Sequence, residues 1–239
     1  MWNQEPSRDE IVVFAAASLT DVMDTLVQQF EEAYPSVDVV VSLGASSVLA
    51  RQIQQGAPAD VFFSASPVWT EYLAEENLLR APARPVIGNR LVVIGPPSAL
   101  LLSSLDDLLA FTDIAVADPE SVPGGQYARE GFERAGLWDA IAPRTIPTRD
   151  VRAAVAAVQT GAAEVAVVYA SDVRGVDGVR VILDWPEAFQ PPIRYTIAVP
   201  RTTQQPNRAF EFVEFVRQPE RNGVWQRFGF VPLGETVLP

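Results

Sequence analysis

Residues 11–21 place small residues and a hydroxyl between a predicted strand and a predicted helix. The apolar stretch 11–14 is typical of a strand buried on both faces. Ser18 stands where the helix should begin, with Asp21 at the spacing of a capping box that has Asp as its acid. A helix start directs unpaired backbone N–H groups outward, and such a spot attracts anions. The junction therefore predicts either an anion site or simply an N-capped helix, because Ser is a common N-cap.

Three further junctions of this kind follow along the chain. Small or polar residues stand where a predicted strand meets a predicted helix at Ser46, at Gly124 and just before Val151. Tyr169 closes another apolar strand at its carboxyl end, which is the edge where ligands gather in doubly wound sheets. A plain turn at Gly124 and a half-buried aromatic ring at Tyr169 are the alternatives. Taken together, the junctions favour an anion site built from hydroxyl and backbone donors.

The composition excludes several classes of function. The chain has 239 residues, of which 48% are hydrophobic, enough for one large α/β domain or two lobes. Its 18 basic and 30 acidic residues give a net charge of −12, which argues against nucleic acid or an anionic membrane as partner. The chain lacks His, Cys and Lys, which excludes His-dependent hydrolases, Schiff-base enzymes, P-loops and Cys/His zinc sites. We therefore expect a protein that is not an enzyme, with no cofactor and no metal site.

No stretch of about 20 apolar residues is present, so no transmembrane helix is expected. The first residues lack the basic and apolar regions of a signal peptide. The protein is therefore either cytoplasmic or begins after a signal peptide that has been removed. The polar residues 1–9 favour the second alternative and predict a flexible N-terminal segment.

Strands and helices alternate along the whole chain, which predicts an α/β fold with mostly parallel sheets flanked by helices. Two connections, near residues 84–90 and 194–199, are expected to divide it into two lobes. The first lobe would hold residues 10–87 and 199–239, and the second would hold residues 88–198. The C-terminal helix and the tail around Trp225 and Phe228 should pack back onto the first lobe.

Several motifs, in this order and spacing, resemble the periplasmic molybdate-binding proteins of ABC importers. They occupy residues 15–20, 46–47, 49–53, 56–60, 88–92, 118–120, 122–123, 150–152 and 168–169. The resemblance runs from about residue 10 to the C-terminus. It implies the two-lobed type II periplasmic-binding-protein fold, with a ligand cleft between the lobes.

The resemblance also implies the site. It assigns hydroxyl and backbone donors to Ser18 and Ser46, backbone donors to Gly124 and Val151, and a phenolic hydroxyl to Tyr169. The implied ligand is molybdate or tungstate. The implied partners are an ABC permease and its ATPase. The protein itself is expected to be a monomer in the periplasm, with or without a membrane tether. Gly124 departs from the family, where alanine is frequent, but only its backbone N–H is used.

The chemistry of the ion agrees with a site made only of donors. Molybdate carries no proton at neutral pH, so a carboxylate facing it would repel it, whereas phosphate keeps a proton and benefits from an acceptor. Asp21, Asp118 and Asp150 lie near the assigned residues in sequence, and capping and turn roles account for them. The alternatives are a binding protein for another tetrahedral oxyanion such as sulfate, an enzyme on the same fold, and a sensory lobe that shares the site.

Overall fold

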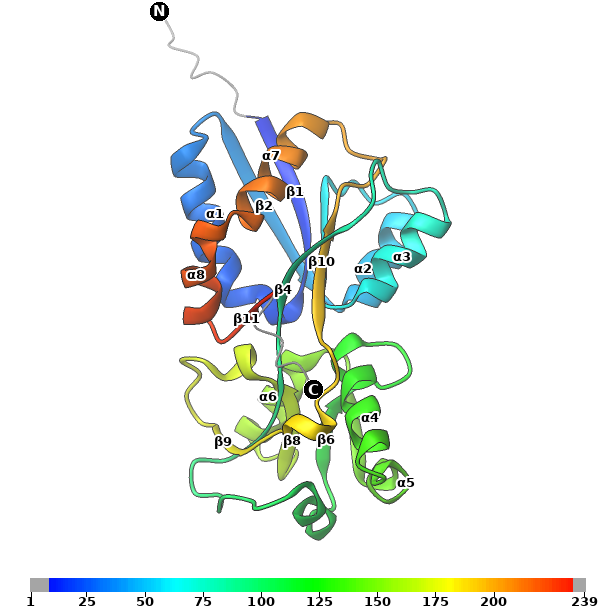
Figure 1. Cartoon of the computed structure of the whole chain (residues 1–239), viewed down its shortest axis with the longest axis vertical. Coiled ribbons are helices and arrows are strands. Elements are labelled where there is room, and N and C mark those ends of the chain that lie inside the picture. The colour runs from blue at the N-terminus through cyan, green and yellow to red at the C-terminus, as the bar shows by residue number, and fades with distance from the viewer. Residues whose placement is uncertain (1–8, 234–239) are drawn as a thin grey trace, which may run out of the picture. The chain divides into compact units, whose positions relative to one another are not determined.

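The computed structural model describes residues 9–233, and contacts divide the chain into two compact units. Unit 1 holds the described residues up to Val86 together with Tyr195–Trp225 (Figure 1). Unit 2 holds Ile87–Arg194 together with the described residues from Gln226 onward. Among the described residues, no helix is long and apolar enough to cross a membrane.

Unit 1 is built on strands that run parallel where the sequence alternates strand and helix. The sheet has the order β11-β4-β10-β3-β1-β2, of which β11 and the last residues of β4 count with unit 2. Strand β1 pairs in parallel with both β2 and β3, whereas β10 is antiparallel to β3 and β11 is antiparallel to β4. The bounds are β1 (Asp9–Ala16), β2 (Val37–Gly44), β3 (Val61–Ser64), β4 (Arg84–Gly88), β10 (Arg194–Ala198) and β11 (Val231–Pro232).

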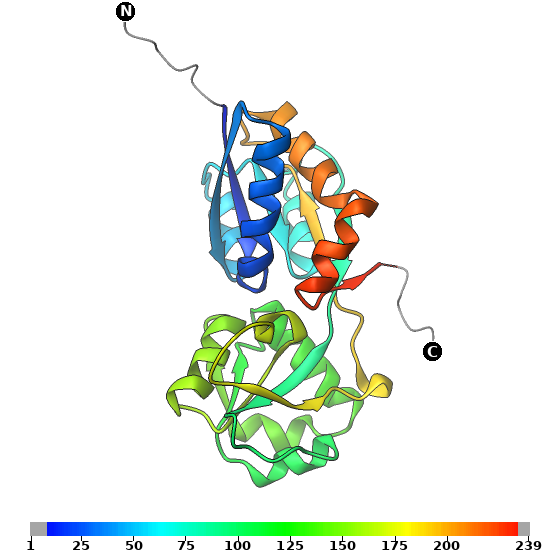
Figure 2. The same ribbon diagram turned by 90° about the vertical axis from the view of Figure 1, so that its left-hand side faces the viewer.

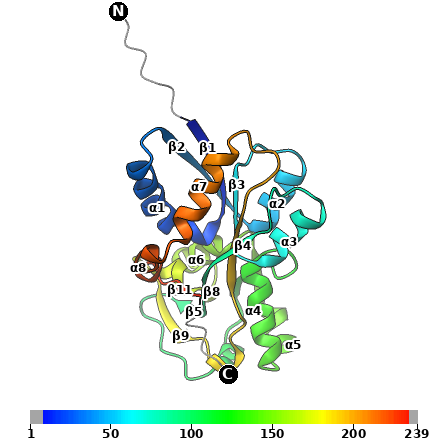
Figure 3. The ribbon, with the colours of Figure 1, turned by 45° about the horizontal axis from the view of Figure 1, so that its top comes forward.

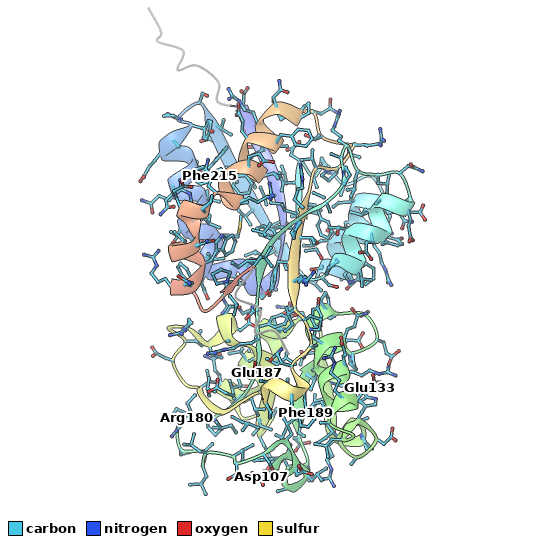
Figure 4. All side chains as sticks on the ribbon, viewed as in Figure 1. Asp107, Glu133, Arg180, Glu187, Phe189 and Phe215 are labelled. Atoms are coloured by element: carbon cyan, nitrogen blue, oxygen red, sulfur yellow. The ribbon has the colours of Figure 1, made fainter. Side chains whose placement is uncertain are left out.

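The helices of unit 1 bury apolar faces against this sheet. Helices α1 and α7 lie side by side (Figures 1 and 2), where Phe30 of α1 meets the rings of Phe212 and Phe215 with centroids 5.1 and 5.3 Å away. Phe215 is labelled in Figure 4. Helices α2 and α3 pack together elsewhere on the unit (Figure 3). The bounds are α1 (Thr20–Ala33), α2 (Ser46–Gln54), α3 (Pro67–Glu75), α7 (Pro206–Arg217) and α8 (Asn222–Arg227).

The prediction that Ser18 caps the first helix is wrong. Ser18 lies inside a short 3-10 turn, η1 (Ala17–Leu19), and α1 begins at Thr20 with Leu19 in the N-cap position and no side-chain cap. Asp21 stands in the first turn of α1. The hydroxyl of Ser18 is not used as a cap because it pairs with the hydroxyl of a distant tyrosine.

Unit 2 has a second sheet, of order β7-β6-β8-β5-β9. Strand β6 is parallel to β7 and β8, whereas β5 is antiparallel to β8 and β9. Both sheets are therefore mixed, because β5 runs against its two neighbours in unit 2 and β10 runs against β3 in unit 1. The bounds are β5 (Leu91–Gly95), β6 (Ile114–Ala117), β7 (Thr145–Thr148), β8 (Val165–Tyr169) and β9 (Arg180–Asp184).

Helices α4 and α6 of unit 2 follow two of its parallel strands. The side chain of Asp150 caps α6 by accepting a hydrogen bond of 2.8 Å from the N–H of Ala153. Gly161 ends α6 with a φ of 73°, in the left-handed conformation that favours glycine. The bounds are η2 (Leu105–Ala110), α4 (Pro123–Arg134), α5 (Trp138–Ile141), η3 (Ala142–Arg144), α6 (Val151–Thr160) and η4 (Ala170–Val173).

The observed units differ from the expected lobes mainly at the C-terminus. Trp225 packs in unit 1 as expected, with its ring centroid 5.8 Å from that of Phe63. The residues that follow count with unit 2, because Val231 pairs with Gly88 at the end of β4. The predicted flexible segment, residues 1–9, lies outside the described residues except for Asp9, which is the first residue of β1.

Candidate functional site

Ser18 and Ser46 occupy equivalent places at one edge of the unit 1 sheet. The parallel register pairs Ala16 with Gly44, and each serine stands two residues beyond its strand end. Both serines are buried, with exposed fractions of 3% and 1%. The carboxyl ends of β1 and β2 therefore place two serines that are far apart in the sequence at the same edge of the sheet.

The hydroxyl of Ser46 has its acceptor role filled within unit 1. Its Oγ accepts a hydrogen bond of 3.0 Å from the N–H of Ala65, just after β3. The hydroxyl proton is then left to donate. Ser46 is also the first residue of α2, so its own N–H lies among the first-turn amides that have no acceptor within the helix. This position can therefore offer two neutral donors to an anion.

Ser18 has a partner that sequence reasoning missed. Its Oγ lies 2.7 Å from the phenolic oxygen of Tyr195 on β10, and that side chain is completely buried. The two residues are 177 positions apart. Tyr195 reads as one more apolar strand residue in the sequence, so no local signal singles it out.

Unit 2 gathers the other three predicted positions. A Cβ atom built on Gly124 would overlap Cγ1 of Val151 and would lie 3.6 Å from the hydroxyl oxygen of Tyr169. The parallel register explains this convergence, because β6 pairs Ala117 with Thr148 of β7 and also runs parallel to β8. The carboxyl ends of three strands therefore meet at one edge, and all three positions are buried.

Backbone donors dominate this second group. Gly124 is the second residue of α4 and Val151 is the first residue of α6, so both amides belong to first helical turns that lack internal acceptors. Helix starts also carry a partial positive charge of about half a unit. Two helix starts beside the buried hydroxyl-bearing ring of Tyr169 form a group suited to anions.

An arginine stands next to Val151, but its charge is matched by a carboxylate. Nε of Arg152 lies 3.6 Å from Oδ1 of Asp172, whose side chain is completely buried. Oδ2 of Asp172 in turn accepts a hydrogen bond of 3.1 Å from the N–H of Tyr169. The pair thus ties the start of α6 to the end of β8 and leaves the local charge balanced. The sequence shows Arg152 in a motif but does not show which acid pairs with it.

The nearby carboxylates have structural tasks, as the sequence predicts. Asp118 accepts hydrogen bonds from the N–H of Glu120, at 3.1 Å, and from the hydroxyl of Ser121, at 2.6 Å. Asp150 caps α6. Across the described part of the chain, no group of three or more His, Cys, Asp or Glu residues is arranged to hold a metal ion. The arrangement can bind an anion through neutral donors.

The chain is similar to known proteins over most of its length. The family described as bacterial extracellular solute-binding protein matches residues 11–231. The molybdate-binding protein ModA of Escherichia coli is 37% identical over 231 residues, which cover 92% of this chain and 88% of the relative.

Solved structures agree with this similarity. A substrate-binding domain assigned to a molybdenum ABC transporter from Clostridium difficile is 32% identical, with a TM-score of 0.72, and the match covers 94% of this chain and 99% of that one. The sulfate-binding protein SubI from Mycobacterium tuberculosis is 17% identical, with a TM-score of 0.83 over 95% of this chain and 88% of that one, a likeness of fold alone. The two-unit α/β architecture is that of type II periplasmic binding proteins. From the family match and the E. coli relative together, the chain belongs to the bacterial extracellular solute-binding proteins.

Proposed function

We propose that this protein is the substrate-binding component of an ABC importer and that it captures molybdate or tungstate. The observation that carries the proposal is the gathering of neutral donors in both units: Ser18 and Ser46 in one, and Gly124, Val151 and Tyr169 in the other. The name of the 37% identical E. coli relative supports molybdate as the ion. On this proposal the chain is a binding protein and not an enzyme.

We further propose that the neutral donors of each group bind the oxyanion through hydrogen bonds. A fully ionised tetrahedral oxyanion only accepts hydrogen bonds, so donors on all sides satisfy it. Each hydrogen bond to a charged group contributes about 1.5–3 kcal/mol, and several together can replace the ion's hydration. The bound ion would then be delivered to a membrane permease and its ATPase, outside the cytoplasm.

A melting experiment tests the choice of ion. Molybdate at about a hundredfold excess over Kd should stabilise the folded protein by about 2.7 kcal/mol, because only the folded state binds it. Scans with molybdate, tungstate, sulfate and phosphate at equal concentrations compare the candidates directly. We expect molybdate and tungstate to raise Tm and phosphate to leave it unchanged. A clear rise with sulfate and none with molybdate would replace this proposal by sulfate binding.

Ser46→Ala tests the hydroxyl donor of unit 1. The substitution removes the proton that Ser46 can donate and keeps its N–H, so molybdate affinity should fall roughly ten- to a hundredfold. Titration calorimetry measures the change in Kd. Ser47→Ala is the matched control, since Ser47 is the next residue of α2 and is equally buried, at 2%. Equal losses in both variants would show that the hydroxyl of Ser46 has no special part in binding.

A further inference from the structure

We infer that Tyr195 is a positioning residue, whose hydroxyl holds the Ser18 side chain so that Ser18 donates its proton to the bound oxyanion. The inference rests on the proposed function, and it adds a residue outside the five predicted from the sequence. The contact that carries it is the 2.7 Å separation between Ser18 Oγ and the Tyr195 hydroxyl oxygen.

The side chains of Ser18 and Tyr195 are both buried and are held by fixed parts of the backbone. Tyr195 is completely buried and Ser18 is 3% exposed, so bulk water does not compete for either hydroxyl. Tyr195 lies at the start of β10, a strand that pairs with β3 beside β1. Ser18 stands two residues beyond the end of β1. The sheet therefore fixes the backbone on both sides of this hydrogen bond, and the bond selects one orientation of the Ser18 hydroxyl.

The direction of the hydrogen bond follows from the chemistry of the ion. A serine hydroxyl has one proton and can also accept. An oxyanion without protons accepts only, so Ser18 must use its one proton on the ion. Tyr195 must then donate its own proton to Ser18 Oγ. Hydrogen bonds linked in this way strengthen one another, so the Tyr195 hydroxyl should make Ser18 a better donor.

A double-mutant cycle with molybdate tests this inference. Tyr195→Phe keeps the buried ring and removes only the hydroxyl, and it should raise Kd about three- to tenfold. In a Ser18→Ala background the same change should raise Kd less than about twofold, because the hydroxyl that Tyr195 orients is gone. Calorimetric Kd values for the unchanged protein, both single variants and the double variant complete the cycle.

Thr196→Val is the matched control. Thr196 is the next residue of β10 and is also buried, and its hydroxyl pairs at 3.0 Å with that of Thr70 on α3, away from Ser18. Successive strand residues point to opposite faces, so this variant removes a buried hydroxyl from the same strand without touching Ser18. We expect its Kd to stay within about twofold of the unchanged protein.

The outcomes distinguish the role of Tyr195 from the proposed function. If the unchanged protein binds molybdate but Tyr195→Phe has no effect, or has an equal effect with and without the Ser18 hydroxyl, the inference is wrong and the proposed function stands. A loss in Thr196→Val as large as that in Tyr195→Phe would also overturn it. If the unchanged protein binds no molybdate, both the proposed function and the inference fail.

Discussion

Replacement of Gly125 by alanine is expected to lower the free energy of unfolding by about 3 kcal/mol, which is the upper end of the typical cost of overpacking. A Cβ atom on Gly125 would overlap the carbonyl oxygen of Ala117 and would lie 2.7 Å from the carbonyl carbon of Asp118. Both neighbours are backbone atoms at the end of β6, so neither can turn away as a side chain would. Urea denaturation measures the loss as a shift of the transition midpoint.

Two other glycines provide controls for this result. The Cβ of Gly124→Ala would overlap Cγ1 of Val151, a side-chain atom that can shift more easily than backbone, so we expect a smaller cost of about 1 kcal/mol. Gly223→Ala, in helix α8, has no atom within 4 Å of the new Cβ and should be neutral or stabilising by up to about 1 kcal/mol. If Gly125→Ala were as stable as Gly223→Ala, the close approach of α4 to β6 would be contradicted.

Arg152→Met is expected to lower the free energy of unfolding by about 3–5 kcal/mol. The substitution keeps much of the side-chain volume but removes the Arg152 guanidinium from the buried carboxylate of Asp172. An uncompensated buried charge is costly because the interior replaces little of its hydration. The same variant should weaken molybdate binding, because the pair connects the start of α6 with the N–H of Tyr169.

The double variant Arg152→Met/Asp172→Asn tests the reason for this loss. Asparagine keeps an acceptor for the Tyr169 N–H and removes the charge, so the double variant should be more stable than Arg152→Met alone. Arg134→Met is the matched control, since Arg134 pairs with Glu130 at the surface with both side chains 42% exposed. Its effect should stay within about 0.5 kcal/mol. A double variant no more stable than Arg152→Met would exclude a buried charge as the cause.

The sequence was sufficient for those features that depend on neighbouring residues. Apolar β-branched runs marked β1, β2, β6 and β8. The helical spacing of Val22, Met23, Leu26 and Phe30 marked α1, and all four side chains are buried. The same patterns placed Ser18 and Ser46 at strand ends, and the parallel register brings those ends to one edge. Strand β4 was missed because Pro85 and its neighbours resemble a loop, although Pro is tolerated where a ladder hydrogen bond is not required.

The five predicted site residues stay a prediction, but the structure places them in two groups, one in each unit. What the sequence by itself determined is the alternation of strands and helices and the absence of His, Cys and Lys. Only the tertiary structure decided which distant groups pair: Tyr195 with Ser18, and Asp172 with Arg152. The physical reason is that strand and helix patterns arise from local backbone preferences, whereas a side-chain partner is chosen by how whole elements pack. Ser18 does not cap α1 for the same reason. Its hydroxyl has a competing partner, Tyr195, on another strand.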